Sequence, residues 1–190
     1  MRIRTPREQR LLYIKTVIRW ILYYLVIFLC FLIMTSGTWN KPILLVPCAV
    51  AIAVGNGQYS SAVTGALCGF LIDIACGKLV GYNAALLAVF CIIISLLYEF
   101  YLRNKFVNYI IITAVTAYIQ CLLDYKFYYE MWEYDEVERI FSQISMKVWA
   151  LTIISSCFVY IIIDFINKKF MPKNHVTIEE AINTAIRSEK

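Results

Sequence analysis

Long apolar stretches separated by short polar segments dominate the sequence, and their spacing predicts the architecture. Six such stretches stand out, at residues 16–35, 42–55, 60–76, 83–102, 106–125 and 148–166. A helix needs about 20 mostly apolar residues to cross the roughly 30 Å hydrocarbon layer of a membrane. The pattern therefore predicts an all-α polytopic membrane protein. Residues 1–168 would form a single domain, a bundle of six membrane-spanning helices, and residues 169–190 a cytoplasmic tail.

The second and third stretches are shorter than the others. The second contains Pro47, which predicts a kink or a continuation of the helix towards Tyr59. The residues from 77 to 82, after the third, fit a segment that re-enters the membrane rather than a plain loop. A count of five spans follows if the second and third stretches form a shallow hairpin.

Composition and charge support a membrane protein and set its orientation. The chain is 61% hydrophobic and 16% charged, whereas a soluble domain carries roughly 25% charged residues. Most Lys and Arg residues lie in the N-terminal segment, in the loop between the fourth and fifth stretches, and in the tail. By the positive-inside rule both termini are predicted to be cytoplasmic. The net charge of +5 reflects this bias and does not indicate nucleic-acid binding.

The residues that usually carry chemistry are sparse, which argues against an enzyme and against a metal or cofactor site. All seven cysteines fall in apolar runs without a C-x-x-C pair, so we interpret them as buried free thiols. The single histidine, His175, lies in the polar tail, so no span has a histidine base for a serine protease. Asp73 and Asp124 lack the Y-D and G-x-G-D contexts of intramembrane aspartyl proteases. Asp124 and Asp164 lie near span ends and are predicted to be interfacial, and Glu99 is predicted to pair with Arg103 at i+4.

The most informative segment runs from residue 65 to 81 and reads G-A-L-C-G-F-L-I-D-I-A-C-G-K-L-V-G. Small residues and one acid recur at four-residue spacing, a stripe that lets a second helix backbone approach closely in lipid. An ionisable group at membrane depth is a candidate functional site. The predicted helix-packing and turn residues are Ser61, Gly65, Gly69, Asp73, Gly77 and Gly81.

Three roles for Asp73 compete. The carboxylate could accept backbone N–H bonds and close the turn between Gly77 and Gly81, it could pair with a polar group on another helix, or it could bind a substrate or coupling ion. We favour the first role, because polar groups in membranes are usually satisfied by backbone or by bundle partners.

Two amphipathic segments outside the spans are candidates for binding a partner. From Asp135 a D-x-x-E capping box leads into one apolar helix face, and Thr177 with Glu180 forms a similar start in the tail. The first segment lies in a loop whose aromatic residues also fit an interfacial belt, and so short a tail helix could fray. The predicted partner-binding residues are Val137, Ile140, Phe141, Ile144, Ile178, Ile182 and Ile186.

The order of these features resembles MreD, the rod shape-determining membrane protein family of bacteria. That family carries a G-x-x-x-G-x-L-x-D-x-x-x-G-x-x-x-G-x-x-A/G-L signature in its third helix and the turn after it. The matching positions here are Gly65, Gly69, Asp73, Gly77, Gly81 and the start of the next helix at Asn83–Leu86. The sequence departs from the family in its neutral loop at residues 56–59, in its long external acidic loop, and in a sixth span without proline.

The resemblance implies a non-enzymatic scaffold of cell-wall elongation in the bacterial cytoplasmic (inner) membrane. Its implied partners are an MreC-like bitopic protein and, through it, the MreB filament, RodA and a penicillin-binding transpeptidase. The family also resembles the six-helix substrate-binding subunits of energy-coupling-factor transporters, so a small-solute-binding subunit is the alternative. The first span counts against that alternative because it reads W-I-L-Y-Y-L-V-I-F-L and lacks the small docking residues such subunits carry.

Overall fold

The computed structural model describes residues 6–36, 42–100, 105–128 and 141–170, and within these ranges all regular structure is helical. The helices in chain order are α1 (Pro6–Thr35), α2 (Leu45–Ala53), α3 (Gln58–Cys76), α4 (Tyr82–Phe100), α5 (Lys105–Tyr128), the π-helical turn η2 (Phe141–Ser145) and α7 (Met146–Phe170). The predicted partner-binding residues Val137, Ile140, Ile178, Ile182 and Ile186 lie outside the described residues.

Among the described residues, five helical segments are long and apolar enough to cross a membrane, which makes the chain a multi-pass membrane protein. They are Tyr13–Thr35, Gln58–Cys76, Tyr82–Phe100, Phe106–Tyr128 and Gln143–Phe170. The predicted stretch at residues 42–55 differs. Only nine of its residues form helix α2, about 13 Å at 1.5 Å per residue, which is less than half of the hydrocarbon layer.

Pro47 does not kink this short helix. It lies in the first turn of α2, where its missing N–H costs no hydrogen bond. The helix also ends at Ala53 and does not continue to Tyr59, since α3 begins only at Gln58.

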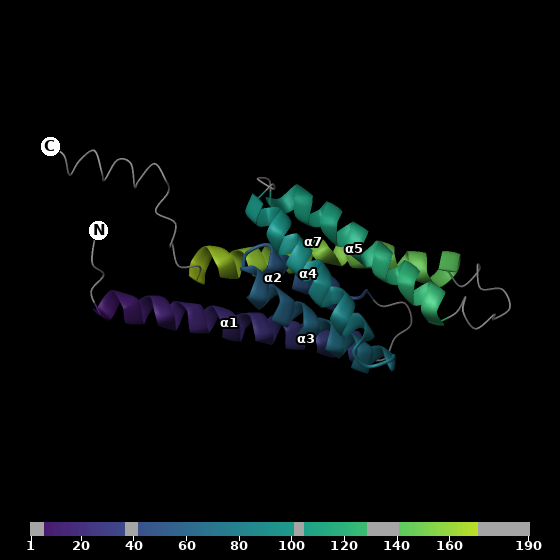
Figure 1. Cartoon of the computed structure of the whole chain (residues 1–190), viewed down its shortest axis with the longest axis horizontal. Coiled ribbons are helices and arrows are strands. Elements are labelled where there is room, and N and C mark those ends of the chain that lie inside the picture. The colour runs from purple at the N-terminus through teal and green to yellow at the C-terminus, as the bar shows by residue number, and fades with distance from the viewer. Residues whose placement is uncertain (1–5, 37–41, 101–104, 129–140, 171–190) are drawn as a thin grey trace.

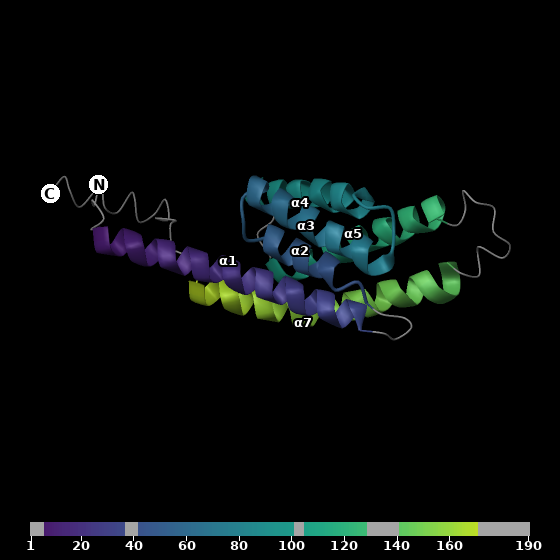
Figure 2. The same cartoon turned by 90° about the horizontal axis from the view of Figure 1, so that it is seen from below.

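Helix α2 occupies the centre of the bundle. All nine of its residues are buried, and it contacts α1, α3, α4, α5 and α7. Figure 2 shows it between the α1–α7 pair and the layer formed by α3, α4 and α5. The Tyr109 hydroxyl of α5 lies 3.1 Å from the Pro47 carbonyl oxygen and 3.2 Å from that of Ser156 in α7, so it joins the three helices. The segment around α2 thus fills the core that the longer helices enclose.

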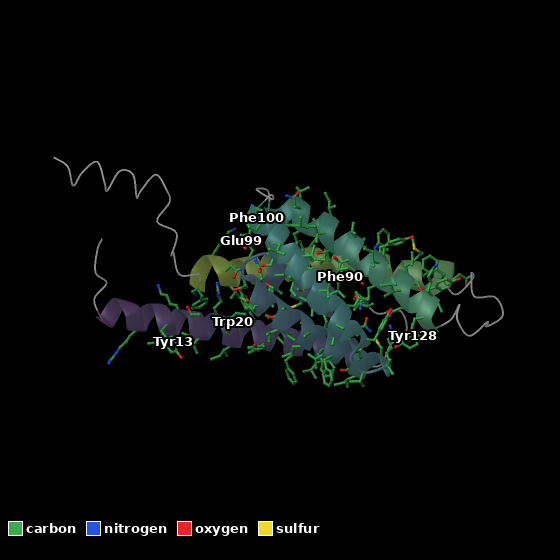
Figure 3. The ribbon with its side chains drawn as sticks, viewed as in Figure 1. Tyr13, Trp20, Phe90, Glu99, Phe100 and Tyr128 are labelled. Carbon is green, nitrogen blue, oxygen red and sulfur yellow. The ribbon has the colours of Figure 1, made fainter. Side chains whose placement is uncertain are left out.

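The two ends of the bundle differ in which elements they contain. The start of α1 and the end of α7 lie at one end, the terminal end, and the α3–α4 turn lies at the other, the turn end (Figure 1). Figure 3 shows Glu99 and Phe100 near the terminal end of α4 and Tyr128 at the turn end of α5. The segment from Ile43 to Asn56 connects the two ends, because Ile43 lines a cavity at the turn end and Asn56 bonds to the first half of α1.

A polar cluster fastens the terminal end. The Arg19 guanidinium donates to Asn56 Oδ1 at 2.8 Å, and the Ser95 hydroxyl donates to the Asn56 carbonyl oxygen, also at 2.8 Å. The Tyr23 hydroxyl donates to Asn167 Oδ1, which joins α1 to α7. Arg19 is only 7% exposed, so this basic residue of the first apolar stretch has a packing role.

Candidate functional site

The small-residue stripe of α3 packs directly against α4. A Cβ added to Gly69 would lie 2.5 Å from the Cα atom of Ala84 and would also clash with the backbone oxygen of Asn83. A Cβ on Gly65 would lie 2.8 Å from both the Leu87 oxygen and the Cys91 sulfur. Only glycine therefore permits this approach, and the partner of the stripe is the next helix of the same chain.

The turn that follows is closed by glycine geometry. Gly77 has φ +63°, and Gly81 has φ +100°. The Lys78 N–H donates to the Asp73 carbonyl at 3.0 Å and the Gly77 N–H to the Ile74 carbonyl at 3.4 Å. This pair of bonds is the Schellman arrangement, which terminates a helix and reverses the chain. The segment predicted to re-enter the membrane is thus a tight connection between two antiparallel helices.

Asp73 holds the far side of this turn. Its side chain is fully buried. Oδ2 accepts the Gly81 N–H at 2.8 Å, and Oδ1 accepts the Asn83 side-chain amide at 2.8 Å and the Asn83 N–H at 3.3 Å. The carboxylate accepts backbone N–H groups and also pairs with a side chain of α4. These contacts are the ones that the first two of the three proposed roles require. Both oxygens are engaged by the protein itself.

The same network continues into α5. Gln120 donates its side-chain N–H to Asn83 Oδ1 at 2.8 Å, so Asp73, Asn83 and Gln120 join α3, α4 and α5. All three side chains are buried. Neither Asn83 nor Gln120 was among the site residues predicted from the sequence. The available signal was an amide inside each apolar run, because such amides bond between helices in membranes.

An ion pair joins the α3–α4 connection to α5, one helical turn beyond Gln120. Lys78 Nζ lies 2.6 Å from Asp124 Oδ2, and the Leu79 N–H donates to the Tyr128 hydroxyl at 3.0 Å. Burial alone would lower the pKa of the Lys78 ammonium, but the Asp124 carboxylate outweighs burial and raises that pKa. Asp124 is 8% exposed, so the protein encloses this carboxylate near the end of α5.

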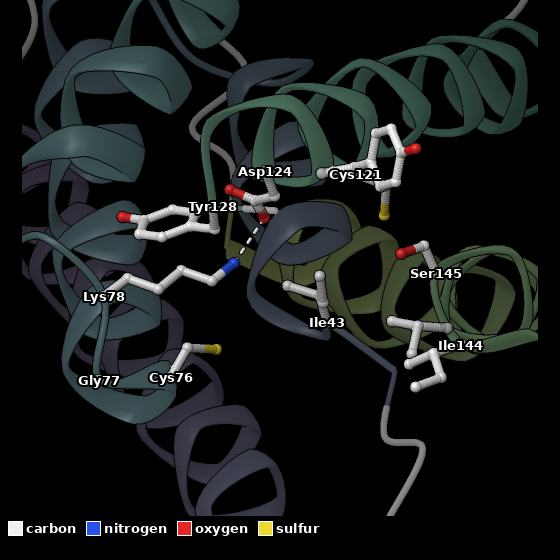
Figure 4. A pocket seen from close by; sticks show the side chains of 11 residues that line it. Ile43, Cys76, Gly77, Lys78, Cys121, Asp124, Tyr128, Ile144 and Ser145 are labelled. Atoms are coloured by element: carbon white, nitrogen blue, oxygen red, sulfur yellow. Dashed lines mark hydrogen bonds and ion pairs between the residues drawn. The ribbon is translucent and has the colours of Figure 1, made fainter. Parts of the chain in front are cut away.

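A cavity of about 430 Å³ opens beside this ion pair. Figure 4 shows Lys78 and Asp124 on one side of it, Ile43 near its centre, and Ile144 and Ser145 opposite. The lining residues are Ile43, Cys76, Gly77, Lys78, Cys121, Asp124, Tyr125, Tyr128, Ile144, Ser145 and Val148. Asp73 does not line the cavity, although the turn that it holds contributes Gly77 and Lys78.

The predicted partner-binding residues Phe141 and Ile144 belong to η2 and not to an amphipathic α-helix. The Phe141 ring packs on Tyr125 with ring centroids 4.8 Å apart, and Ile144 is half-exposed beside the cavity. Their positions therefore link α5 to the start of α7.

The cysteines are all free thiols. Cys76 is exposed and lines the cavity, which corrects the prediction that every cysteine is buried. Within the described ranges, no group of three or more His, Cys, Asp or Glu residues is arranged to hold a metal ion.

Comparison of this chain with protein-family models, curated proteins and solved structures finds no match.

Proposed function

We propose that this protein is a non-enzymatic membrane scaffold of the bacterial cell-wall elongation machinery, similar to MreD. It would contribute to rod-shape determination by binding an MreC-like bitopic protein, and through it the MreB filament, RodA and a penicillin-binding transpeptidase. It would lie in the cytoplasmic membrane with both termini in the cytoplasm. The chain would cross the membrane six times, with the segment around α2 as the second crossing.

The observation that carries this proposal is the structural role of the segment that resembles the MreD signature. Gly65 and Gly69 admit the α4 backbone, Gly77 and Gly81 make the turn, and the Asp73 carboxylate accepts hydrogen bonds from Gly81 and Asn83. Each of these residues serves the joint between two helices. An architectural joint suits a protein that positions partners.

The test measures both cell shape and the binding of a partner. Depletion of the protein from its rod-shaped host should round the cells, and the affinity-purified protein should co-elute with a bitopic MreC-like protein. Gly69→Leu, which breaks the joint, should lose both the shape and the partner. Gly57→Ala is the matched control, because a Cβ at Gly57 meets nothing within 4 Å. Unchanged cell shape on depletion, with no bitopic partner recovered, would refute the scaffold.

A small-solute-binding subunit is the second candidate, and the cavity at the turn end favours it. Its volume of about 430 Å³ lies within the range of small-molecule sites. In this case Lys78 and Asp124 would contact the solute, since the Asp73 oxygens are occupied by Gly81 and Asn83. A water-soluble molecule that co-purifies with the protein and is lost in Lys78→Met would support this function, whereas its retention in that variant would oppose it.

A further inference from the structure

A buried cation at the terminal end has no counter-charge among the described residues. Arg19 lies in a membrane-spanning segment and is 7% exposed. Its Nη2 atom donates to the neutral amide of Asn56 at 2.8 Å, and its Cζ atom lies 5.7 Å from the centroid of the Tyr23 ring. The ion pairs of the described residues involve other side chains. Because an enclosed charge without an opposite charge is costly, this position favours the binding of an anion.

A second cation lies one helical turn away on the same face of α1. Lys15 precedes Arg19 by four positions, which is about one turn and 6 Å along the axis. Lys15 is exposed and also forms no ion pair with a described carboxylate. Like charges at this spacing repel each other, whereas an anion between them would be attracted by both. It would contact the exposed Lys15 ammonium and Arg19 Nη1, the guanidinium nitrogen that is neither enclosed without a partner nor bonded to a described residue.

Lys15 lies on a part of α1 that projects beyond the end of α7. Helix α1 extends past α7 at the terminal end (Figure 2). The Tyr23 hydroxyl donates to Asn167 Oδ1, and the two helices run in opposite directions. Phe170, the last residue of α7, therefore lies near the level of Trp20. Lys15 is more than one turn beyond that level, so an anion can reach its ammonium without entering the bundle.

Aromatic side chains mark this part of α1 as the level of the lipid head groups. The Trp20 ring packs on those of Tyr23 and Tyr24, with centroids 5.5 and 6.0 Å apart. Tryptophan and tyrosine are enriched at both membrane–water interfaces. Arg19 precedes this aromatic group directly and Lys15 lies one turn further out, so both cations are at the depth where a membrane supplies phosphate groups.

We propose that the Lys15–Arg19 face of α1 binds the phosphate of an anionic phospholipid such as phosphatidylglycerol. A guanidinium suits this ligand because its donors match the geometry of phosphate oxygens. Phosphatidylcholine is a weaker ligand because its own quaternary ammonium neutralises its phosphate. The inference does not rest on the scaffold function, since it concerns the lipid contact of α1 whichever partner the protein has.

The test is native mass spectrometry of the full-length protein released from nanodiscs with equal amounts of phosphatidylglycerol and phosphatidylcholine. Phosphatidylglycerol adducts should predominate. Lys15→Gln should lower the ratio of the two adducts about fivefold, the effect of one cation close to an anionic surface. Equal amounts of the two adducts on the unmodified protein would overturn the proposal.

Arg10→Gln is the matched control. It removes the same charge from an exposed position of the same helix, but Arg10 precedes Arg19 by nine positions, about two and a half turns, and so lies on the opposite face. The adduct ratio should stay unchanged in this variant. Equal losses in Arg10→Gln and Lys15→Gln would show an unspecific attraction by surface charge and would overturn the proposal.

Arg19→Gln tests the buried cation itself. Glutamine keeps a donor for Asn56 but carries no charge, so the preference for phosphatidylglycerol should fall at least as far as in Lys15→Gln. An undiminished preference in a folded Arg19→Gln protein would refute a site at this residue. If the variant does not fold, the comparison of Lys15→Gln with Arg10→Gln still decides.

Inorganic phosphate, added at constant ionic strength, distinguishes a lipid from a soluble source of the phosphate group. Retained phosphatidylglycerol adducts would show that the acyl chains contribute and would support a lipid as the occupant. Complete displacement by millimolar phosphate would show that a soluble anion occupies the site and would overturn the lipid assignment.

Discussion

Gly69→Ala should separate α3 from α4. The new Cβ would lie 2.5 Å from the Ala84 Cα atom, whereas carbon atoms in contact stay about 3.5–4.0 Å apart. The backbones must therefore move apart by roughly 1 Å. The movement also strains the bonds between Asp73 and Asn83, since the backbone oxygen of Asn83 is one of the atoms displaced.

The magnitude follows from two terms of opposite sign. Overpacking against backbone lies at the upper end of its usual range, about 3 kcal/mol. Alanine recovers about 1 kcal/mol of helix propensity relative to glycine. The net loss is about 2 kcal/mol, which corresponds to a fall in Tm of roughly 4–8 °C for a chain of this length. Gly65→Ala should cost less, because one of its close contacts is the Cys91 side chain and not backbone.

Thermal unfolding in detergent, followed with a thiol-reactive fluorophore, measures the effect. Cys68 and Cys91 are fully buried and react only when the bundle opens. Gly57→Ala is the control, since no atom lies within 4 Å of its added Cβ. The expected order of Tm values is Gly57→Ala, then Gly65→Ala, then Gly69→Ala. A Gly69→Ala protein as stable as Gly57→Ala would refute the close-packing argument.

Three further predictions concern the turn end. Gly77→Ala should lower stability by about 1–2 kcal/mol, since alanine resists a φ of +63°, and Gly77→Asn should lower it less; equal losses in chemical unfolding would contradict this. Asp73→Asn should cost about 1–3 kcal/mol, because an amide places a donor against the donors of Gly81 or Asn83, and Asp73→Leu should cost more; an unchanged midpoint in either variant would speak against the network. Because Asp124 raises the pKa of Lys78, the ion pair should stabilise the fold below about pH 10, and this stabilisation should be lost as the pH rises through the raised pKa. The free energy of unfolding should therefore fall more steeply at alkaline pH than it does in Lys78→Met. Identical curves for the two proteins would count against the pair.

Local patterns predicted the long helices well. The apolar stretch 60–76 corresponds to α3 at Gln58–Cys76, and 83–102 corresponds to α4 at Tyr82–Phe100. Glycine spacing also placed the close packing and the turn on the right residues, because glycine at i+4 and a positive φ are both readable from one short segment. These features depend on neighbours in sequence.

Contacts between distant residues were not predictable in the same way. Lys78 and Asp124 are 46 positions apart, and a carboxylate near a span end has many possible partners in one sequence. Gln120 is a single amide in an apolar run. The sequence therefore shows that this residue is unusual there, but it does not show that its side chain reaches Asn83. The burial of α2 was not predictable either, because its composition is as apolar as that of the long helices and only the packing shows that protein surrounds it on every side.

The burial of α2 has a consequence for how the chain is made in the cell. As a helix it covers less than half of the hydrocarbon layer, and its stability comes from contacts with five other helices. Helices α3, α4, α5 and α7 are synthesised after it, so α2 lacks four of its five neighbours when it leaves the ribosome. The insertion machinery must therefore hold or shelter this segment until the last helix arrives, and a chain cut short before α7 should be recognised as unfinished and degraded.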